Sequence, residues 1–325
     1  MGTGTISIAM CTFNGAAWVG QQLRSLLQQQ RRPDELVICD DASTDQTWAI
    51  VREFADRAPF PVTLKQNPER LGVASNFSQA IGMCSGELIA PCDQDDWWGP
   101  RKLLVLGEAL ERDPALGLVF SDANLVDEDL RPLGVRLWDT LYLERPQRER
   151  LTNGHAVPVL ARTNVVTGAT MMFRAELRPL ILPISPLWLH DAWMALLISA
   201  VRPCGMVDEP LVDYRQHPRQ QIGARRTNIL DQVRIGLEMD TQYFAADAQR
   251  WGEIYERLRA HGTAMRYPRD LAVLAEKARF TRDRYQMRLD PAGRWEAIAR
   301  HWASGNYQSL GWGWKSLLQD VVIQA

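Results

Sequence analysis

Three carboxylates follow an apolar, strand-like run within four residues. The run Leu88-Ile89-Ala90 leads into Asp93-Gln94-Asp95-Asp96. Carboxylates this close repel one another unless a cation lies among them, and such hard oxygen ligands suit Mg²⁺ or Mn²⁺, which complete their shells with water and substrate phosphates. We therefore predict that Asp93 and Asp95 hold a divalent metal. The alternative is a solvated turn that caps the next helix, although such a turn does not need the Trp97-Trp98 pair that follows.

A second acidic loop, Asp40-Asp41-Ala42-Ser43-Thr44-Asp45, follows another apolar run. Its carboxylates could accept hydrogen bonds from the N–H and O–H groups of a base or a ribose. Asp and Ser are also ordinary helix-capping residues, so the loop by itself is weak support for a site. It gains weight in combination with the polar loops that follow the other strand-like runs, such as Cys11-Thr12-Phe13-Asn14-Gly15.

Asp191 precedes an apolar, helix-like segment at residues 192–200, which places it at or near a helix N-terminus. A positioned carboxylate can take the proton of an acceptor hydroxyl as that hydroxyl attacks. An N-cap role is the alternative. The pair His190-Asp191 would also suit the metal site of a phosphohydrolase, but no further His follows at helical spacing to support that function.

A local basic segment, Tyr214-Arg215-Gln216-His217, comes later in the chain. We predict that Arg215 and His217 close over a diphosphate and offset the charge of a leaving nucleotide. A solvated loop is the alternative. Near the proposed base, Trp188 and Trp193 could stack on sugar rings, although aromatic packing in the core is at least as consistent with their surroundings.

The elements that must position these residues alternate between strand and helix in the first third of the chain. Apolar runs at 6–11, 36–39, 62–65, 88–92 and 118–120 are separated by helical patterns at 18–29, 45–57, 73–84 and 100–113. This rhythm predicts an α/β fold with a doubly wound, mainly parallel sheet. Ligands of such sheets bind at the carboxyl ends of the strands, where the acidic loops are expected.

The pattern changes beyond about residue 122, where strands become shorter and connections longer. Residues 123–225 are expected to form the acceptor part of a domain that spans 1–225 and whose nucleotide-binding part is 1–122. Within it, the stretch 141–157 is rich in Arg, Glu and Pro and is expected to be an exposed excursion. Helix-compatible segments at 229–255, 270–287 and 294–302 predict a helical C-terminal region at 226–325.

The bulk composition indicates a globular enzyme and not a nucleic-acid-binding protein. The 325 residues are 46% hydrophobic, and a net charge of -2 provides no overall field for a polyanion. The five scattered cysteines form no CxxC pair and fit a reducing compartment. Residues 1–10 lack the regions of a signal peptide, and no apolar run is long enough for a membrane span. We expect a cytoplasmic protein.

Three motifs together resemble those of family 2 glycosyltransferases of the GT-A fold, in order and in spacing. They are Thr12-Phe13-Asn14, the loop at 40–45 and Asp93-Gln94-Asp95-Asp96-Trp97. The resemblance is strongest over residues 5–125 and continues more loosely to about 225. It implies a Rossmann-like GT-A domain with a helical C-terminal appendage, which transfers a sugar from a nucleotide-sugar donor to a hydroxyl.

The resemblance also implies roles for individual residues. Mn²⁺ or Mg²⁺ would be bound by Asp93 and Asp95, and the catalytic base would be Asp191. Residues implied to bind the nucleotide are Thr12, Asn14, Asp40, Asp41, Asp93, Gln94, Arg215 and His217. Residues expected to line the substrate site are Asp96, Trp97, Gly168, His190 and Trp193.

Together with His190-Asp191-Ala192-Trp193 and Tyr214-Arg215-Gln216-His217, the third motif resembles the rhamnosyltransferase-type branch. That resemblance implies a dTDP-linked sugar such as dTDP-rhamnose as the donor, and a UDP-linked sugar is the alternative. The residue after the paired Asp, commonly Gly in the family, is Ala42 here. The implied reaction is a single displacement with inversion, on a glycan or lipid-linked acceptor in cell-surface polysaccharide synthesis. The aromatic and basic stretch 302–318 has the character of an interfacial segment, so peripheral contact with the inner face of the membrane is a hypothesis, and ordinary packing of the helical tail is slightly favoured over it.

Other functions of nucleotide-binding sheets fit less well. A sugar nucleotidyltransferase normally has a Gly-rich basic loop after its first strand, and Cys11-Thr12-Phe13-Asn14-Gly15 is not one. A dehydrogenase would show GxGxxG at this place, and a P-loop NTPase would show GxxxxGK[ST]. A catalytically silent nucleotide-sugar-binding or scaffolding protein of the same fold remains an alternative, although intact acidic residues at every expected position argue against it.

Overall fold

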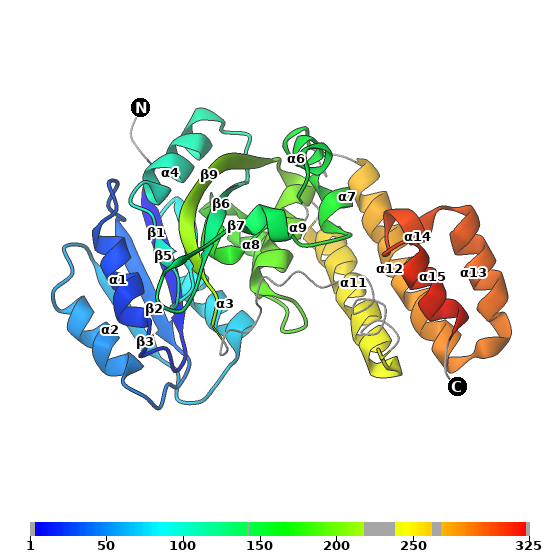
Figure 1. The fold of residues 1–325 in the computed structure, drawn as a ribbon, viewed down its shortest axis with the longest axis horizontal. Helices are drawn as coiled ribbons and strands as arrows, with labels where there is room; N and C mark the ends of the chain where they lie inside the picture. The colour runs from blue at the N-terminus through cyan, green and yellow to red at the C-terminus, as the bar shows by residue number, and fades with distance from the viewer. Residues whose placement is uncertain (1–3, 142, 218–237, 262–267, 323–325) are drawn as a thin grey trace.

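The computed structural model describes residues 4–141, 143–217, 238–261 and 268–322, and in these residues it contains one mixed sheet of nine strands (Figure 1). The strand order is β3-β2-β1-β4-β8-β6-β9-β5, and β7 pairs with β6 beside this path. The strands are β1 (Ile6–Thr12), β2 (Glu35–Asp40), β3 (Val62–Gln66), β4 (Leu88–Cys92), β5 (Trp97–Trp98), β6 (Leu118–Val126), β7 (Pro132–Arg136), β8 (Met171–Arg174) and β9 (Cys204–Arg215).

Each central strand alternates between two apolar cores, one on each face of the sheet. In β1, Ile8 and Met10 belong to one core, together with residues of α1 (Val19–Leu27), α2 (Thr47–Ala55) and α4 (Lys102–Arg112). Ala9 belongs to the other core, which also contains residues of α3 (Val73–Met83) and α9 (His190–Val201) and is called the α9-side core below. Because a strand points successive side chains to opposite faces, a strand covered on both faces must be apolar throughout. The near-continuous apolar runs in the sequence are therefore the buried strands, as predicted.

The carboxyl ends of the main strands meet at one edge of the sheet. β1 pairs in parallel with β2 and β4, and β2 with β3. β8 is antiparallel to both β4 and β6, so two reversals return β6 to the direction of β4, and β9 runs parallel to β6. The loops after β1, β2, β4 and β9 are thereby brought together although they come from distant parts of the chain.

The middle of the chain is more helical than expected. The stretch 141–157 was predicted to be an exposed excursion, and that prediction is wrong. It holds α6 (Arg145–Thr152) and the start of α7 (Ala156–Leu160), and its apolar residues Leu143, Leu151 and Val157 are buried in the α9-side core. The polar residues that dominate the stretch cover one face of short helices whose other face is packed. The remaining short elements here are α5 (Leu137–Thr140), η1 (Gly168–Thr170), η2 (Ala175–Leu177) and α8 (Arg178–Ile181).

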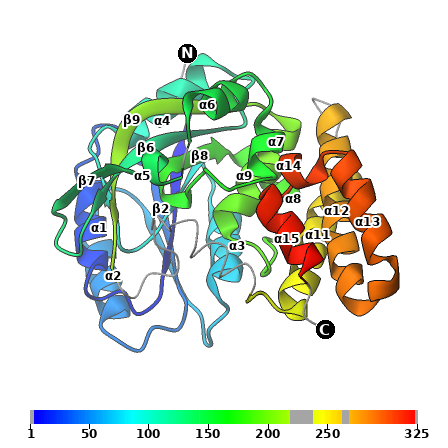
Figure 2. The same ribbon diagram turned by 45° about the vertical axis from the view of Figure 1, so that its right-hand side comes forward.

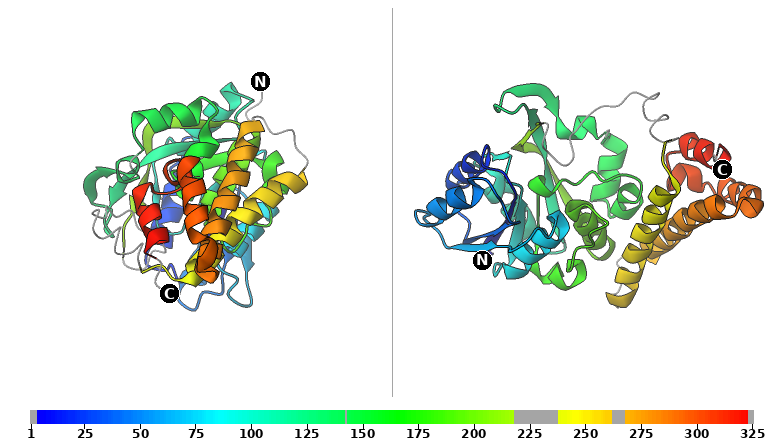
Figure 3. Two further views of the ribbon diagram at one scale, coloured as in Figure 1. Left: turned by 90° about the vertical axis from the view of Figure 1, so that its right-hand side faces the viewer. Right: turned by 90° about the horizontal axis from the view of Figure 1, so that it is seen from below.

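The C-terminal region is helical, as the periodicity predicted, and gathers at the end of the molecule away from β1–β3 (Figures 1 and 3). The helices are α11 (Thr241–His261), α12 (Pro268–Leu289), α13 (Arg294–Ala303), α14 (Asn306–Ser309) and α15 (Trp314–Val321), with η3 (Pro291–Gly293) before α13. Trp188 donates its indole N–H to the carbonyl of Arg250 at 3.1 Å, and Arg257 donates to the carbonyl of Leu182 at 2.9 Å. These bonds join α11 to the α8–α9 side of the sheet domain (Figure 2). The expected boundary near residue 225 lies outside the described residues.

A buried charge network holds the last helices together. Asp320 is fully buried and accepts hydrogen bonds from Arg284 at 2.8 Å, Arg288 at 3.1 Å and the hydroxyl of Tyr307 at 3.0 Å. Removing one partner from a buried network leaves the remaining charges without compensation. The anchor for α15 is therefore electrostatic as well as apolar.

We predict that Asp320→Asn lowers the free energy of unfolding of this region by about 3–5 kcal/mol, because two arginines lose their buried counter-charge. Denaturant unfolding followed by circular dichroism measures the change. The matched control is Glu53→Gln, which breaks an exposed ion pair with Arg57 and should cost less than about 1 kcal/mol. Equal losses in the two variants would contradict the assignment.

Candidate active site

Four carboxylates crowd the edge where β4 and β9 end. Burial, together with the Asp95 and Asp191 carboxylates, raises the pKa of Asp93 to about 8. Burial and the carboxylates of Asp96, Asp93, Asp191 and Asp95 likewise raise the pKa of Tyr214 well above its ordinary value. Tyr214 is the penultimate residue of β9, so these shifts place the loop after β4 and the start of α9 around one point. The predicted metal ligands and the predicted base share one electrostatic environment.

His217 joins this cluster from the segment after β9. Its Nε2 lies 2.9 Å from Oδ2 of Asp95, and its ring stacks on Trp18 with centroids 3.9 Å apart. This separation is that of a hydrogen bond between the imidazole and the carboxylate, so an ion that took both groups as ligands would replace this bond. The stacking on Trp18 fixes the plane of the imidazole.

Arg215 binds other parts of the domain through its guanidinium. Its side chain is 2% exposed, and its guanidinium donates to the carbonyls of Asp95 and Glu128 and, at 2.6 Å, to the amide oxygen of Gln21. Its backbone N–H donates to Oδ1 of Asp96 at 3.0 Å. The contact of the guanidinium with a diphosphate stays a prediction. Arg215 anchors the acidic loop from beneath.

Gln94 connects the acidic loop to the loop after β1. Its Oε1 accepts the backbone N–H of Phe13 at 2.9 Å, and its Nε2 donates to the carbonyl of Phe13 at 3.0 Å. A Cβ at Gly15 would lie 2.1 Å from that Oε1, so a larger residue there would displace the Gln94 side chain from Phe13. Gln94 thus positions the loop predicted to bind the nucleotide, and its amide is largely used for that purpose.

Asp40 organises the loop after β2. It is fully buried, and it accepts hydrogen bonds from the hydroxyl of Thr12 at 2.8 Å and from the backbone N–H of Ser43 at 2.9 Å. Ala42 has φ 59°, in the left-handed region that costs a residue with a Cβ about 1–2 kcal/mol. The turn is therefore formed with alanine where the family commonly has glycine. The hydroxyl of Ser43 also accepts the N–H of Asn14 at 2.9 Å, which connects the two loops.

Asp41 faces the segment after β3. Its carboxylate accepts hydrogen bonds from the backbone N–H groups of Leu71 at 2.7 Å and Gly72 at 2.9 Å, and from Nδ2 of Asn67 at 3.0 Å. Together with Asp40, it makes a continuous polar rim along the carboxyl ends of β1, β2 and β3. The predicted nucleotide residues Thr12, Asn14, Asp40 and Asp41 are thus brought together, and their contact with a base or ribose stays a prediction.

Asp191 is held at the first turn of α9 by two groups from other elements. Its Oδ1 accepts Nδ2 of Asn164 at 3.1 Å, and its Oδ2 accepts the backbone N–H of Gly168 at 3.1 Å. The residue is half-buried. Its carboxylate therefore has a fixed direction, which a general base needs.

Two residues expected to line the substrate site are packed in the protein. Trp193 is 2% exposed, and its indole donates to the carbonyl of Ile181 at 2.7 Å. The ring belongs to the α9-side core, which is the packing given above as the alternative to stacking on a sugar. His190 stacks on Phe77 at 3.9 Å, and burial lowers the pKa of the imidazole. A Cβ at Gly168 would lie 2.4 Å from Nε2 of His190, so this glycine allows the close approach.

Asp96 is also beneath the surface, 1% exposed, while Trp97 is half-buried on β5. Burial and the neighbouring Asp95 and Asp93 raise the pKa of Asp96 well above its ordinary value. Asp96 therefore supports the loop from inside, and its predicted place at the substrate site stays a prediction. Trp97 pairs with Asp213 of β9 in the sheet, and its predicted contact with substrate stays a prediction.

The donor set fits a metal that is completed by substrate. Among residues 4–141, 143–217, 238–261 and 268–322, no three His, Cys, Asp or Glu side chains converge tightly enough to hold an ion by themselves. Mg²⁺ and Mn²⁺ commonly take one or two carboxylates and fill the rest of the shell with phosphate oxygens and water. Asp93, Asp95 and His217, at an edge with an excess of negative charge, are suited to that open type of site.

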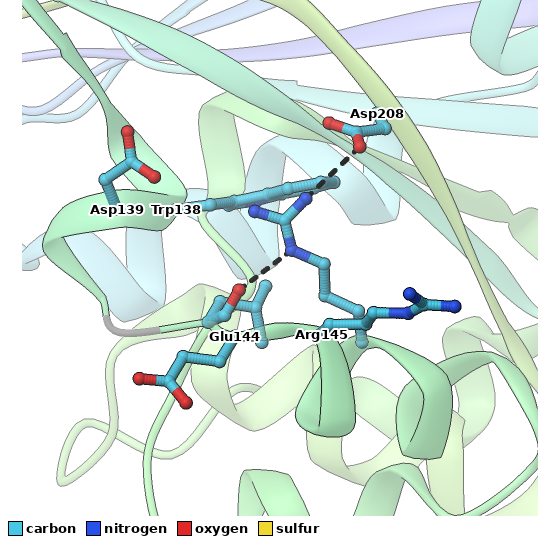
Figure 4. Close-up of a pocket in the computed structure, with 7 residues that line it drawn as sticks. Trp138, Asp139, Glu144, Arg145 and Asp208 are labelled. Atoms are coloured by element: carbon cyan, nitrogen blue, oxygen red, sulfur yellow. Dashed lines mark hydrogen bonds and ion pairs between the residues drawn. The ribbon is translucent and has the colours of Figure 1, made fainter.

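A cavity of about 630 Å³ lies elsewhere, between α5, α6 and β9 (Figure 4). Arg148 crosses it, donating to Oδ2 of Asp208 at 3.2 Å and to the carbonyl of Leu143 at 2.8 Å. None of the carboxylates at the strand edge lines it. The cavity is therefore separate from the candidate active site.

Comparison with known proteins agrees with this geometry. A family model described as glycosyl transferase family 2 matches residues 7–166. The matched residues contain the acidic loops at the sheet edge, whereas Asp191, in the first turn of α9, lies beyond them. Residues 7–166 belong to glycosyl transferase family 2. The matched part of this family 2 protein includes Thr12, the loop at 40–45 and the loop at 93–96.

Two curated relatives show the extent of the likeness. The uncharacterized protein Rv1520 of Mycobacterium tuberculosis is 34% identical over 128 residues, which are 38% of this chain and 36% of that protein. The chain thus spans about a third of the length of that relative. The dTDP-rhamnosyl transferase RfbG of Shigella flexneri is 24% identical over 243 residues, 72% of this chain and 80% of RfbG.

Solved structures share the fold. TarS 1-349 of S. aureus in complex with UDP-GlcNAc superposes with a TM-score of 0.53 at 15% identity, covering 86% of this chain and 87% of TarS. The mannosyltransferase PcManGT from Pyrobaculum calidifontis in complex with GDP-Man and Mn²⁺ has the same TM-score at 19% identity, covering 99% and 87%. The family 2 chain therefore has the GT-A fold, as the motifs predicted.

Two residues of the site, Trp18 and Asn164, were missed from the sequence. Neither belongs to a motif, and each acts through a contact with an element distant in the chain. Tyr214 belongs to the basic segment predicted from the sequence, but nothing in that segment indicates that it lies among carboxylates. A signal was available for Gly15, which directly follows the Thr12-Phe13-Asn14 motif.

Proposed function

We propose that this protein is an inverting, metal-dependent glycosyltransferase, which moves a sugar from a nucleoside-diphosphate donor to a hydroxyl of a glycan or lipid-linked acceptor. The observation that carries the proposal is the convergence of Asp93, Asp95 and Asp191 at one edge of a family 2 domain. The carboxylates at this edge could supply both of the functions that such a transfer needs. One group must accept a proton, and another must offset charge on the leaving diphosphate.

Mn²⁺ or Mg²⁺ would be held by Asp93 and Asp95, with His217 as a third ligand. When bound, such an ion neutralises developing charge on a diphosphate leaving group. The contact between His217 and Asp95 places the imidazole next to a proposed ligand, which supports this set. Arg215 and Gln94 hold the loop in place, so they orient the ligands.

Asp191 would accept the proton of the acceptor hydroxyl as its oxygen attacks the anomeric carbon. Oδ1 of Asp191 accepts hydrogen bonds from Asn164 and from the backbone N–H of Ala192, whereas Oδ2 accepts one from Gly168 and keeps a lone pair for the incoming O–H. In this single displacement the bond to the diphosphate breaks as the new glycosidic bond forms. The configuration at the anomeric carbon is inverted.

The nucleotide would lie along the rim made by Thr12, Asn14, Asp40 and Asp41. The name of RfbG supports dTDP-rhamnose as the donor, since that relative matches across most of both chains. The titles of the solved structures name UDP-GlcNAc and GDP-Man, so a comparison of bases is the decisive measurement.

A peripheral membrane contact is proposed for the C-terminal helices, in a cytoplasmic protein at the inner face of the membrane. Four tryptophans there are more than half exposed: Trp295, Trp302, Trp312 and Trp314. Trp295 and Trp302 lie seven residues apart on α13, which puts them on the same side of that helix. Indoles prefer the boundary between lipid and water. Over the described residues, each helix is too short or too polar to cross a bilayer.

Titration calorimetry with dTDP, UDP and GDP, each with and without Mn²⁺, tests the donor site. We expect one nucleotide to bind in a metal-dependent manner, and Asp93→Ala/Asp95→Ala to lose that binding. Asp56→Ala, which removes an exposed carboxylate after α2, is the control and should bind like the parent protein. Absence of binding by the parent protein under every condition would favour the catalytically silent scaffolding alternative.

Asp191→Asn should lower kcat by about 10²–10⁴-fold while the affinity for the nucleotide changes less than about twofold, because the amide cannot accept the proton. Turnover with the donor identified above and calorimetry of nucleotide binding measure the two quantities. Glu296→Gln, at an acid in the first turn of α13, controls for loss of a carboxylate at a helix start. Unchanged turnover in Asp191→Asn would remove the residue from the mechanism.

Flotation with vesicles of phosphatidylglycerol and phosphatidylcholine tests the membrane contact. We expect the full chain to float and a variant with the four exposed tryptophans changed to Gln to remain at the bottom. A control variant changes exposed apolar residues of the sheet domain, Leu71, Val73 and Leu133, to Gln. Equal flotation of the tryptophan variant and the parent protein would contradict the proposed membrane contact.

A further inference from the structure

Arg257 of α11 binds the segment that leads into α9, the helix of the proposed base. Its two terminal guanidinium nitrogens donate to the carbonyls of Leu182 at 2.9 Å and of Pro183 at 3.1 Å. A guanidinium presents its donors in a fixed fork, which suits two successive carbonyls. The side chain is half-buried, and its Cζ lies 5.5 Å from the ring centroid of Trp193, the fourth residue of α9. One side chain of the C-terminal region thus contacts both the segment before α9 and α9 itself.

Two further contacts join the same segment to α11. The hydroxyl of Ser185 donates to Glu253 at 2.5 Å, and the indole of Trp188 donates to the carbonyl of Arg250 at 3.1 Å. Positions 250, 253 and 257 lie three and four residues apart, so they form one stripe of the helix. A neighbouring stripe is buried in the α9-side core and comprises Trp251, Ile254 and Leu258. One face of α11 therefore combines apolar packing with polar contacts to residues 182–188.

The segment before α9 is closed into a loop that contains Asp191. Trp193 donates its indole N–H to the carbonyl of Ile181 at 2.7 Å, and this bond joins the two ends of residues 181–193. Arg257 lies on this closure, because it binds the residue that follows Ile181 and lies against the ring of Trp193. The contacts of Arg257 are therefore made at the point that fixes the first turn of α9.

We propose that Arg257 positions the base, Asp191, from the C-terminal region. The inference rests on the proposed function, since it needs Asp191 as the base. Asn164 and Gly168 direct the carboxylate from the sheet domain, and Arg257 holds the backbone from which that carboxylate projects. Displacement of a reacting group by about 1 Å can cost about 10²-fold in rate, so such a support affects kcat. Arg257 is a positioning residue, because it acts through the loop at 181–193.

Docking of the C-terminal helices is the alternative role of Arg257. A residue that only docks these helices would affect the melting temperature and leave the kcat of the folded protein unchanged. A positioning residue lowers kcat through Asp191, so its loss has little effect once that carboxylate has been removed. Losses from two groups that act as one unit are not additive. A double-mutant cycle therefore separates the two roles.

The experiment measures release of the nucleoside diphosphate from dTDP-rhamnose, UDP-GlcNAc or GDP-Man by the full chain with Mn²⁺. Transfer to water needs no identified acceptor, and the attacking water must also give up a proton. With the donor that the parent protein cleaves fastest, we expect Arg257→Met to lower kcat by about 10- to 100-fold. The KM for that donor should change less than about twofold, because the predicted nucleotide rim lies on other elements. In an Asp191→Asn background, the same substitution should lower kcat by less than about twofold.

The matched control is Arg259→Met, two residues further along α11. Arg259 is exposed, and its ion pair with Glu256, at 3.6 Å, lies within the same helix. This variant should keep the kcat of the parent protein. Should Arg257→Met fold poorly, Ser185→Ala removes a single hydroxyl contact between α11 and the same segment. Its smaller loss of kcat should likewise vanish in the Asp191→Asn background.

The outcomes separate the two proposals. If Asp191→Asn releases the nucleoside diphosphate as fast as the parent protein, the base assignment fails, and the positioning role fails with it. If Asp191→Asn is slow but Arg257→Met has the kcat of the parent protein, the base stands and the role of Arg257 is wrong. Equal factors of loss with and without the Asp191 carboxylate would also overturn that role, because the effect would not pass through the base.

Discussion

Mutual repulsion among carboxylates is the constraint on which the rest of this structure depends. Asp93, Asp95, Asp96 and Asp191 are brought to one edge of the sheet, and partial burial makes their charges costly. Such an arrangement persists only if the surrounding fold holds it. The structure supplies that support in two forms: a buried arginine and hydrogen bonds from the neighbouring loops.

The residues that hold the acidic loop lie inside the domain and in the neighbouring loop after β1, so the solvent side of the acidic loop is left for ligands. Arg215 fixes the backbone of the acidic loop through the carbonyl of Asp95, and Gln94 ties the same loop to Phe13. His217 approaches Asp95 from the end of β9. The topology is what permits this, because the reversed strand β8 lets β9 run parallel to β4 and deliver its last residues to the same edge.

The proposed base belongs to a different part of the chain but to the same environment. Asp191 lies in the first turn of α9, and α9 packs on the other face of the sheet from α1, α2 and α4. Gly168 has no side chain, which allows His190 to pack closely next to Asp191. Metal ligands and base are therefore held by separate elements that share one sheet. The C-terminal helices, joined to α8 and α9 through Arg257 and Trp188, add an exposed aromatic surface at the other end of the molecule.

Local sequence patterns were enough to predict the doubly wound core, the family motifs and the loops that follow the strands. Apolar runs of fixed length and polar loops between them are local patterns, so β1, β2, β3 and β4 and the acidic residues after them could be predicted within a few positions. The helical C-terminal region was predictable for the same reason.

Only the tertiary structure decided which charges face a ligand and which face the interior. Arg215 looks like a solvated basic residue in a basic segment, but pairing of β9 beside β6 turns its guanidinium into the domain, where carbonyl groups of distant loops bind it. Trp193 and Lys102 are similar cases, since burial depends on what packs over a residue and not on its neighbours in the chain. The stretch 141–157 was misjudged because its apolar residues are few, and their burial depends on a core built by α9 and β6. The local sequence shows the periodicity of helices and strands and therefore predicts them. The partner of a buried charge depends on contacts between residues that are far apart in the chain.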